Sequence, residues 1–297
     1  MSASLTTSSA SSATLLEPRP GERRRKLTSW AFAGLAALST FLVLIPLASV
    51  LTYVLRQGLS GLSWDFFVSL PKPAGDPGGG MANAIVGSLV VVGGACAMGL
   101  PAGILAGVYL AEVGRGRFAK VVRFLADVLT GLPSIAIGVF VYALVVITMR
   151  RFSAVAGSIA LAVVMFPTMT RTTEELLRLV PPHLREAALG LGVPAWRATL
   201  FIVVRTAAPG IATSAMLSIA RVMGETAPLL FTAFNNRLWS LTLDRPMATL
   251  PVQIFTYATS PYADWQAQAW AGALVLVGLV LTLNLAARAL SHRLGPR

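Results

Sequence analysis

The chain has few of the residues that carry covalent, redox or metal chemistry. It contains one cysteine, Cys96, and two histidines, His183 and His292, in 297 residues. A single cysteine excludes a disulfide within the chain, and two histidines far apart in sequence are a poor basis for a metal site or a histidine-based triad. The sequence also has no Gly-x4-Gly-Lys-[Ser/Thr] run, the loop that commonly holds ATP phosphates. We therefore expect no catalytic residue, no metal and no cofactor.

Charged side chains are also scarce. They make up 12% of the residues, against 55% hydrophobic residues, and the mean hydropathy is +0.72. An ordinary soluble domain has about 25% charged residues. Because a membrane span needs about 20 mostly apolar residues, the long apolar blocks predict an all-α, polytopic integral membrane protein with about six transmembrane helices. The blocks lie near Trp30–Leu55, Ala84–Leu110, Phe124–Ile147, Ala154–Met169, Ala207–Phe234 and Ala269–Leu290.

The net charge of +12 is unevenly distributed along the chain. If both termini are cytoplasmic, 17 of the 24 Lys and Arg residues fall in inside segments and 6 in outside segments, with Arg221 left within a span. An excess of Lys and Arg in cytoplasmic loops is the usual mark of membrane orientation. We therefore expect a multi-pass membrane protein with both termini in the cytoplasm, and no binding of nucleic acid.

The domain organisation follows from composition. Residues 1–27 are rich in Ser, Thr and Ala, cannot bury a core, and are expected to form a disordered cytoplasmic tail. Residues 28–297 are expected to form one transmembrane domain. Outside loops are predicted near Arg56–Met81 and Asn235–Gln266, and the second of these is long for a membrane protein.

Small residues and prolines mark special positions within the apolar blocks. Gly99, Gly103 and Gly107 recur at every fourth residue of the second block. On a helix they share one ridge, which lets a neighbouring helix approach closely. Pro101 and Pro133 each remove a backbone donor and favour a kink.

The largest inside loop is predicted at residues 171–206. Pro182 suits the first turn of a helix over His183–Leu189, Gly192 allows a sharp reversal, and Pro194 can open a second helix that continues to Val204. Two short helices at an angle are therefore predicted at the membrane face. This spacing is also typical of an amphipathic pair that only connects two spans.

The same loop carries a family resemblance. The spacing of Arg185–Gly192 and Ile202 resembles the "EAA loop" of the permeases of bacterial ABC importers, although Val204-Arg205 stands where Leu-Pro is usual. The resemblance implies a type I ABC-importer permease architecture, in which this loop is a coupling helix docked in a groove of an ATPase subunit. It also implies that four residues couple to the ATPase: Glu186, Ala187, Ala188 and Gly192.

A charged pair lies well inside the fifth apolar block. Each ionisable group costs about 2.5–3.5 kcal/mol near the bilayer centre on insertion scales, so such groups usually face a cavity or a partner. Arg221 and Glu225 are four residues apart, on one face of a helix. One hypothesis is a self-neutralising ion pair that fixes helix packing. The other is an anion path lined by Arg221, Glu225 and Thr226, because a guanidinium binds phosphate through two parallel hydrogen bonds. In this second hypothesis, Glu225 weakens the hold of Arg221 on the anion and allows release.

Four segments narrow the resemblance to the phosphate branch of the ABC-importer permeases. They are Asn83–Ser88, Gly107–Glu112, Gly131–Gly138 and Arg221–Thr232. The resemblance implies transport of inorganic phosphate by alternating access, powered by ATP hydrolysis in a separate subunit. It further implies three protein partners: a second, similar permease, an ATPase dimer and an external phosphate-binding protein.

Three alternatives stay open at this point. A permease for another oxyanion, such as phosphonate, molybdate or sulfate, shares the EAA loop. A secondary transporter needs no socket for an ATPase. An intramembrane enzyme has the weakest case, because no His, Ser or Asp constellation lies within the predicted spans and Asp127 stands alone near the inner end of the third.

Overall fold

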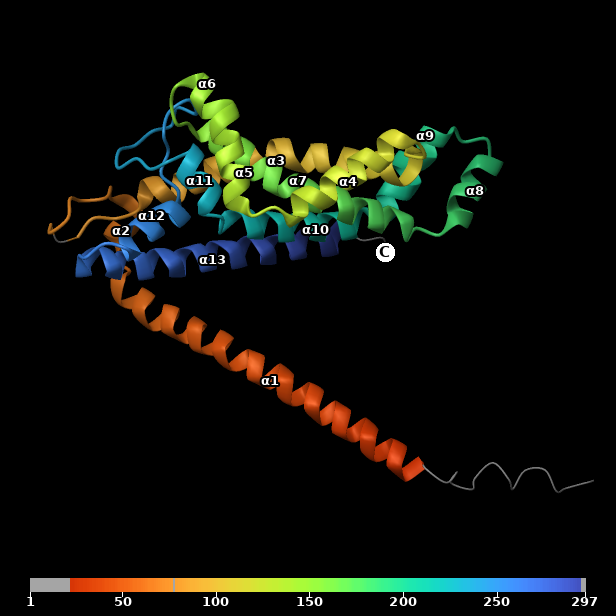
Figure 1. The fold of residues 1–297 in the computed structure, drawn as a ribbon, viewed down its shortest axis with the longest axis horizontal. Coiled ribbons are helices and arrows are strands. Elements are labelled where there is room, and N and C mark those ends of the chain that lie inside the picture. Colours follow the sequence, from red (N-terminus) through yellow and green to blue (C-terminus); the bar gives the residue numbers. More distant parts are fainter. Residues whose placement is uncertain (1–21, 77, 295–297) are drawn as a thin grey trace, which may run out of the picture. The chain divides into compact units, whose positions relative to one another are not determined.

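The computed structural model describes residues 22–76 and 78–294 (Figure 1). Every regular element in those two ranges is a helix, which confirms the all-α prediction. The chain divides into two compact units, Met1–Tyr53 and Val54–Arg297. In chain order, with η for π-helical segments, the elements are α1 (Glu22–Gly61), α2 (Trp64–Val68), α3 (Ala82–Val108), η1 (Tyr109–Val113), α4 (Arg117–Gly131), α5 (Ser134–Val141), η2 (Tyr142–Val146), α6 (Ile147–Met149), α7 (Ala154–Arg178), α8 (Pro182–Gly190), α9 (Ala195–Arg197), η3 (Ala198–Val203), α10 (Val204–Met223), α11 (Ala227–Thr232), α12 (Leu250–Ala258) and α13 (Ala263–Leu294).

The first unit holds most of α1. Its large apolar side chains, from Leu27 to Leu51, are exposed around the helix. This surface is typical of a helix that lipid or other helices surround. The predicted disordered tail over residues 1–27 falls mainly on residues 1–21, which lie outside the described residues, and α1 begins at Glu22.

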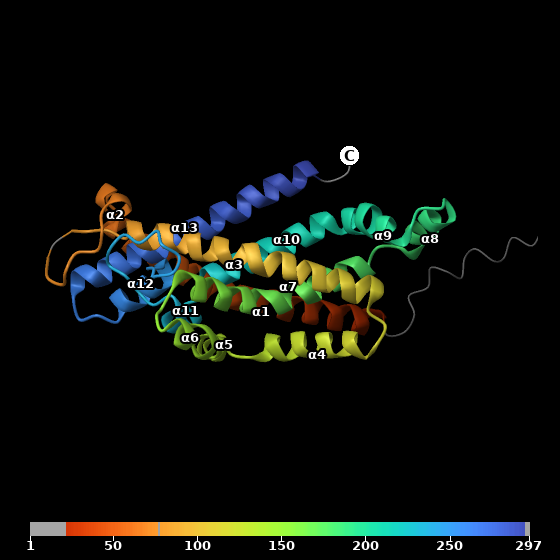
Figure 2. The ribbon, with the colours of Figure 1, turned by 90° about the horizontal axis from the view of Figure 1, so that it is seen from above.

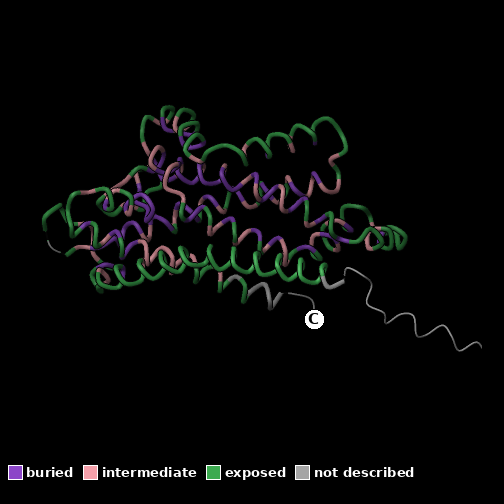
Figure 3. Tube along the Cα trace, turned by 60° about the horizontal axis from the view of Figure 1, so that its bottom comes forward, coloured by how far each residue is buried: buried purple, intermediate pink, exposed green. Residues whose placement is uncertain are grey.

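The second unit is built around the close pairing of α3 and α7, which lie side by side in Figure 2. The glycine ridge of α3 faces α7, as predicted. A methyl group on Gly103 would lie 2.5 Å from Cβ of Met169, and one on Gly107 would lie 2.6 Å from Cβ of Thr173. Only glycine allows this approach. The buried positions run through the middle of the unit as a result (Figure 3).

The predicted number of spans is confirmed within the described part of the chain. Five helices there are long and apolar enough to cross a membrane, or six if a bent pair counts as one span. The five are Arg24–Gly61, Ala82–Val113, Ala154–Arg178, Ala195–Met223 and Ala263–Ala286.

The third predicted span is not one straight helix. It is the pair α4 and α5, which meet at 109°. Leu132 has an extended backbone, with φ −75° and ψ 137°, because the ring of Pro133 disfavours the helical conformation of the residue before it. The break therefore lies in the middle of the apolar block, and Pro133 does more than kink a continuous span.

The fourth and fifth predicted spans had wrong boundaries. The fourth is α7, which continues past the expected end at Met169 to Arg178 because its charged side chains find partners on other helices. The fifth begins at Ala195 and ends at Met223. The predicted outside loop over residues 235–266 also contains α12, and α13 already begins at Ala263.

The second unit has two ends, which Figure 1 separates clearly. The "α8 end" comprises η1, the start of α4, the end of α7, α8 and α9. The "α12 end" comprises α2, α6, α12 and the segment over residues 233–249. Each end carries candidate functional residues.

Candidate functional site

Proline and glycine residues separate α8 from the preceding and the following helix. Pro181 precedes the helix with an extended backbone, and Pro182 occupies the first turn, where its missing N–H is not needed. After the helix, Gly192 has φ +78°, a left-handed conformation that glycine adopts readily. The amide of Val193 donates to the carbonyl of Ala188 at 3.0 Å and closes the turn. The predicted helix and the predicted reversal are both present.

The remainder of the predicted inside loop is helical and continuous with spans. Residues 171–178 are the last two turns of α7, and the helix that opens at Ala195 runs without a break to Met223. The prediction of two separate short helices was therefore wrong, and α8 alone stands apart. Pro194 does begin a helix, and neither Pro209 nor Gly210 interrupts that helix before its end at Met223.

The residues predicted to couple to an ATPase divide between two faces of this turn. Glu186, Ala187 and Gly192 are exposed, as is Leu191. Ala188 is only 4% exposed and packs within the chain, so it does not share the exposed side of the turn with the other three. Helical spacing explains the difference, because Ala188 lies one turn after the half-buried Leu184.

Arg185, next to Glu186, fastens α8 to the rest of the unit. Its Nη2 lies 2.6 Å from Oε1 of Glu112 on η1, and its Nε lies 3.2 Å from the same oxygen. Its Nη1 donates to the carbonyl of Val180, and its Nη2 also donates to the carbonyl of Leu177, each at 2.7 Å. One side chain thus ties α8 both to η1 and to the end of α7.

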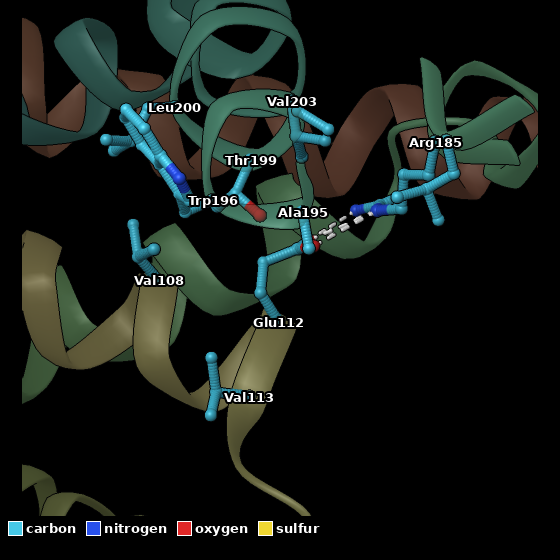
Figure 4. A pocket seen from close by; sticks show the side chains of 11 residues that line it. Val108, Glu112, Val113, Arg185, Ala195, Trp196, Thr199, Leu200 and Val203 are labelled. Atoms are coloured by element: carbon cyan, nitrogen blue, oxygen red, sulfur yellow. Dashed lines mark hydrogen bonds and ion pairs between the residues drawn. The ribbon is translucent and has the colours of Figure 1, made fainter. Parts of the chain in front are cut away.

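A groove of about 510 Å³ opens beside this ion pair. Figure 4 shows Glu112 and Arg185 meeting at its edge, with Trp196 and Leu200 opposite. Apolar side chains form most of its wall: Val108, Val113, Leu189, Trp196, Leu200 and Val203.

A second set of charges lies at the α8 end, around Glu174 of α7. The Glu174 side chain is 2% exposed and pairs with three arginines. Arg123 of α4 donates from Nε at 2.7 Å, Arg171 lies 3.3 Å away, and Arg178 lies 2.6 Å away. Arg171 also binds Asp127 of α4 through two hydrogen bonds of 2.7 Å. The prediction that Asp127 stands alone is therefore wrong.

Arg123 makes a further connection. Its Nη2 donates to the carbonyl of Leu110 on η1 at 2.7 Å. Sequence reasoning missed Arg123, Glu174 and Glu112 as site residues. Of these three residues, only Glu112 could have been noticed in the sequence, because it is the last residue of one of the segments that resemble phosphate permeases.

The predicted pair Arg221 and Glu225 lies at a helix break and not inside a continuous helix. α10 ends at Met223, and the Glu225 amide donates to the carbonyl of Val222 in a turn at 3.2 Å. Nε of Arg221 is 3.9 Å from Oε1 of Glu225, and the two side chains are 57% and 17% exposed. At this distance the pair is an ion pair without a direct hydrogen bond. The guanidinium is open to a further anionic group.

The break itself is held in place by α5. Thr226 precedes α11, and its carbonyl accepts from the Leu229 amide at 3.1 Å. A methyl group on Gly138 of α5 would lie 2.6 Å from Cα of Pro228. Non-helical backbone at membrane depth is tolerated where protein buries it or where it lines a cavity. The contact with α5 therefore helps to fix the short non-helical segment that carries Glu225 and Thr226, close in the chain to Arg221.

Hydrogen bonds give a structural role to another of the segments that resemble phosphate permeases, Asn83–Ser88. Asn83 donates to the carbonyl of Asn236 at 2.7 Å, and the Leu250 amide donates to Ser88 at 2.7 Å. These bonds tie the α12 end to the start of α3. Nearby, burial raises the pKa of the Tyr257 hydroxyl above its ordinary value.

In the part of the chain that the structure describes, no three His, Cys, Asp or Glu residues are grouped so that they could hold a metal ion. The candidate sites therefore consist of charge pairs and exposed helix surfaces.

The chain is similar to known proteins in both sequence and fold. Residues 99–296 match the family described as "Binding-protein-dependent transport system inner membrane component". The chain is 46% identical over 274 residues to "Phosphate transport system permease protein PstA" of Yersinia pestis, covering 90% of this chain and 93% of that protein. The chain belongs to this family of permeases. The permease is also 45% identical over 265 residues to the protein of the same name from Haemophilus influenzae, with 89% and 94% covered.

Solved structures agree on the fold of the permease. One is a chain of an alginate ABC transporter in complex with an alginate-bound periplasmic protein, with TM-score 0.66, 15% identity and coverage of 92% of this chain and 98% of that chain. Another is a chain of the inward-facing MetNI methionine ABC transporter, with TM-score 0.62, 16% identity, and 73% and 96% covered. The permease thus has the fold of ABC-importer permeases, as predicted, and is a multi-pass membrane protein.

Proposed function

We propose that this permease moves inorganic phosphate across the bacterial inner membrane as one subunit of an ATP-driven importer. One observation carries the proposal. An exposed guanidinium, Arg221, lies at a helix break in a chain 46% identical, over nearly its full length, to a phosphate permease. Phosphate is an oxyanion that a guanidinium binds through paired hydrogen bonds.

The proposal assigns ATP hydrolysis to a separate subunit. The sequence offers no P-loop, whereas α8 presents Glu186, Ala187 and Gly192 on an exposed surface suited to a partner. The partners we expect are a PstC-like second permease, a PstB-like ATPase dimer and a PstS-like external phosphate-binding protein. The excess of Lys and Arg in the segments of the α8 end supports a cytoplasmic position for that end and for both termini.

The three residues at the helix break have different proposed roles. Arg221 holds the anion, Glu225 competes for the guanidinium so that the anion can leave, and Thr226 offers a hydroxyl beside the path. ATP-driven movement at α8 shifts the spans and opens this region to one side of the membrane and then to the other.

Uptake into liposomes tests the proposal. All four components are reconstituted with ATP on the ATPase side, and uptake of radiolabelled phosphate, sulfate and molybdate is compared. We expect ATP-dependent uptake of phosphate that Arg221→Gln abolishes and that Arg151→Gln, at the α12 end, leaves unchanged. ATP-independent uptake would indicate a secondary transporter, and preference for sulfate or molybdate would indicate another oxyanion permease. Unchanged phosphate uptake by Arg221→Gln would remove Arg221 from the path.

A further inference from the structure

We propose that the Glu112–Arg185 ion pair is the joint through which α8 passes movement to the spanning helices, and that Arg123 and Glu174 carry the movement on to α4. This inference rests on the proposed function, in which an ATPase moves α8. It assigns a positioning role to residues that do not touch the substrate or ATP.

The packing of α8 makes such a joint necessary. Of its nine residues, only Ala188 is buried, so apolar packing holds the helix weakly. The polar contacts of Arg185 are correspondingly strong. They comprise the 2.6 Å ion pair to Glu112 and the two 2.7 Å hydrogen bonds to carbonyls at the end of α7. A displacement of α8 therefore reaches η1 through this one side chain, whereas α7 is also joined to α8 directly by the short link over residues 179–181.

The segment η1 also receives a second arginine, from α4. Arg123 of α4 donates to the carbonyl of Leu110, only two residues before Glu112, at 2.7 Å. Arg185 of α8 and Arg123 of α4 thus both bind to the same five-residue segment. A shift of η1 caused by α8 reaches α4 without passing through the rest of the bundle.

Glu174 makes the connection to α4 stiff. It is buried between Arg123 of α4 and two arginines of its own helix, and Arg171 reaches on to Asp127 of α4. Charge-assisted bonds of 2.6–2.7 Å are stronger than neutral hydrogen bonds, and the low local dielectric strengthens them further. α4 is also the first half of the bent pair that meets α5 at 109°. α5 in turn packs through Gly138 on Pro228, beside the Arg221 break.

The two arginines of the proposed joint each have a carboxylate partner at the α8 end, Glu112 for Arg185 and Glu174 for Arg123. Arg185 and Glu112 are 25% and 12% exposed, and Arg123 and Glu174 are 24% and 2% exposed. Each arginine spans two or more elements, whereas the exposed pair Arg151–Asp244 at the α12 end is separated by 3.3 Å and only closes a surface loop. The α12-end pair therefore offers a control in which an ion pair is removed without touching the proposed joint.

The test measures how much phosphate is transported per ATP hydrolysed by the complete four-component complex in liposomes. Glu112→Gln keeps the size and one acceptor oxygen but removes the charge. We expect it to lower the ratio at least about fivefold, the lower range of measured couplings between sites, while ATP hydrolysis stays within about twofold. Arg151→Gln should leave the ratio unchanged. A purely structural role would reduce uptake and hydrolysis together and keep the ratio constant, which overturns the proposal.

A double-mutant cycle then tests whether the two residues act as one joint. The double variant Glu112→Gln/Arg185→Gln should be no worse than the more severe single variant, because the interaction is lost only once. Fully additive losses would overturn the proposal. If Glu112→Gln does not assemble, Glu112→Asp, which keeps the charge and shortens the side chain, is measured in the same way, and an unchanged ratio counts against the joint. A wild-type complex without ATP-dependent uptake would instead refute the proposed function.

Discussion

Arg171 and Asp127 face each other through two parallel hydrogen bonds, Nε to Oδ1 and Nη2 to Oδ2, each of 2.7 Å. This bidentate pair joins α7 to α4. Arg171 also reaches the buried Glu174, so one guanidinium serves an exposed carboxylate and a buried one. The two carboxylates are similar in chemistry and differ in exposure, 53% for Asp127 and 2% for Glu174.

This difference predicts unequal effects of two neutralising substitutions. Asp127→Asn removes an exposed ion pair and should cost less than about 1 kcal/mol of stability. Glu174→Gln leaves Arg123, Arg171 and Arg178 close together without their shared carboxylate, and should cost about 3–5 kcal/mol, as for a broken buried pair. Thermal unfolding of the purified permease complex, followed by tryptophan fluorescence, measures both. Equal losses for the two variants would show that the Glu174 cluster is not a stabilising centre.

The ion pairs also show where sequence reasoning reaches its limit. The apolar blocks, the glycine ridge, and the proline and glycine around α8 follow from local rules on length, spacing and backbone conformation, and all of these features are present. Glu174 and its partner Arg123 are 51 residues apart in the chain. No local rule pairs them, because their meeting depends on how α4 packs on α7.

The helix breaks could not be predicted from the sequence for a related reason. Hydropathy over residues 124–147 is high enough for one span, and a proline in such a block is compatible with either a kink or a full break. The 109° turn at Pro133 depends on the partner that α5 finds in α11. The spacing of Arg221 and Glu225 likewise gave the right partners, although α10 had already ended at Met223.

Gly138 offers a direct test of the packing between α5 and α11. Gly138→Ala places a methyl group 2.6 Å from Cα of Pro228, and because backbone cannot rearrange like a flexible side chain, we expect a loss of about 1–3 kcal/mol. Phosphate uptake should fall as well, because α11 begins just after Glu225. The matched control is Gly93→Ala in α3, where nothing lies within 4 Å of the added methyl group. A Gly138→Ala variant as stable and active as the Gly93→Ala variant would contradict the close approach.

Gly192 and Gly190 form a second matched pair, two residues apart on the same exposed turn. Gly192 has a left-handed backbone, whereas Gly190 ends α8, and an added methyl group at either position meets nothing within 4 Å. Gly192→Ala should therefore cost roughly 1–2 kcal/mol through backbone strain alone, and Gly190→Ala should cost little. Co-purification with a tagged ATPase subunit measures the consequence for docking. We expect weaker association for Gly192→Ala, with Gly192→Asn intermediate because asparagine tolerates this conformation. Equal binding by Gly192→Ala and Gly190→Ala would show that the turn does not shape the docking surface.

Glu225 distinguishes a release role from simple charge neutralisation. Its carboxylate lies 3.9 Å from Arg221, near enough to attract the guanidinium and too far for a hydrogen bond. Removing the charge in Glu225→Gln leaves Arg221 with a stronger net attraction for an anion. Phosphate should then bind more tightly and leave more slowly, so that uptake shows a lower KM together with a lower maximal rate. Asp244→Asn at the α12 end, which also removes one carboxylate beside an arginine, should change neither constant. Uptake measured against phosphate concentration separates the outcomes. A Glu225→Gln permease with unchanged uptake would exclude the release role, and a raised KM would instead indicate that Glu225 positions Arg221 for binding.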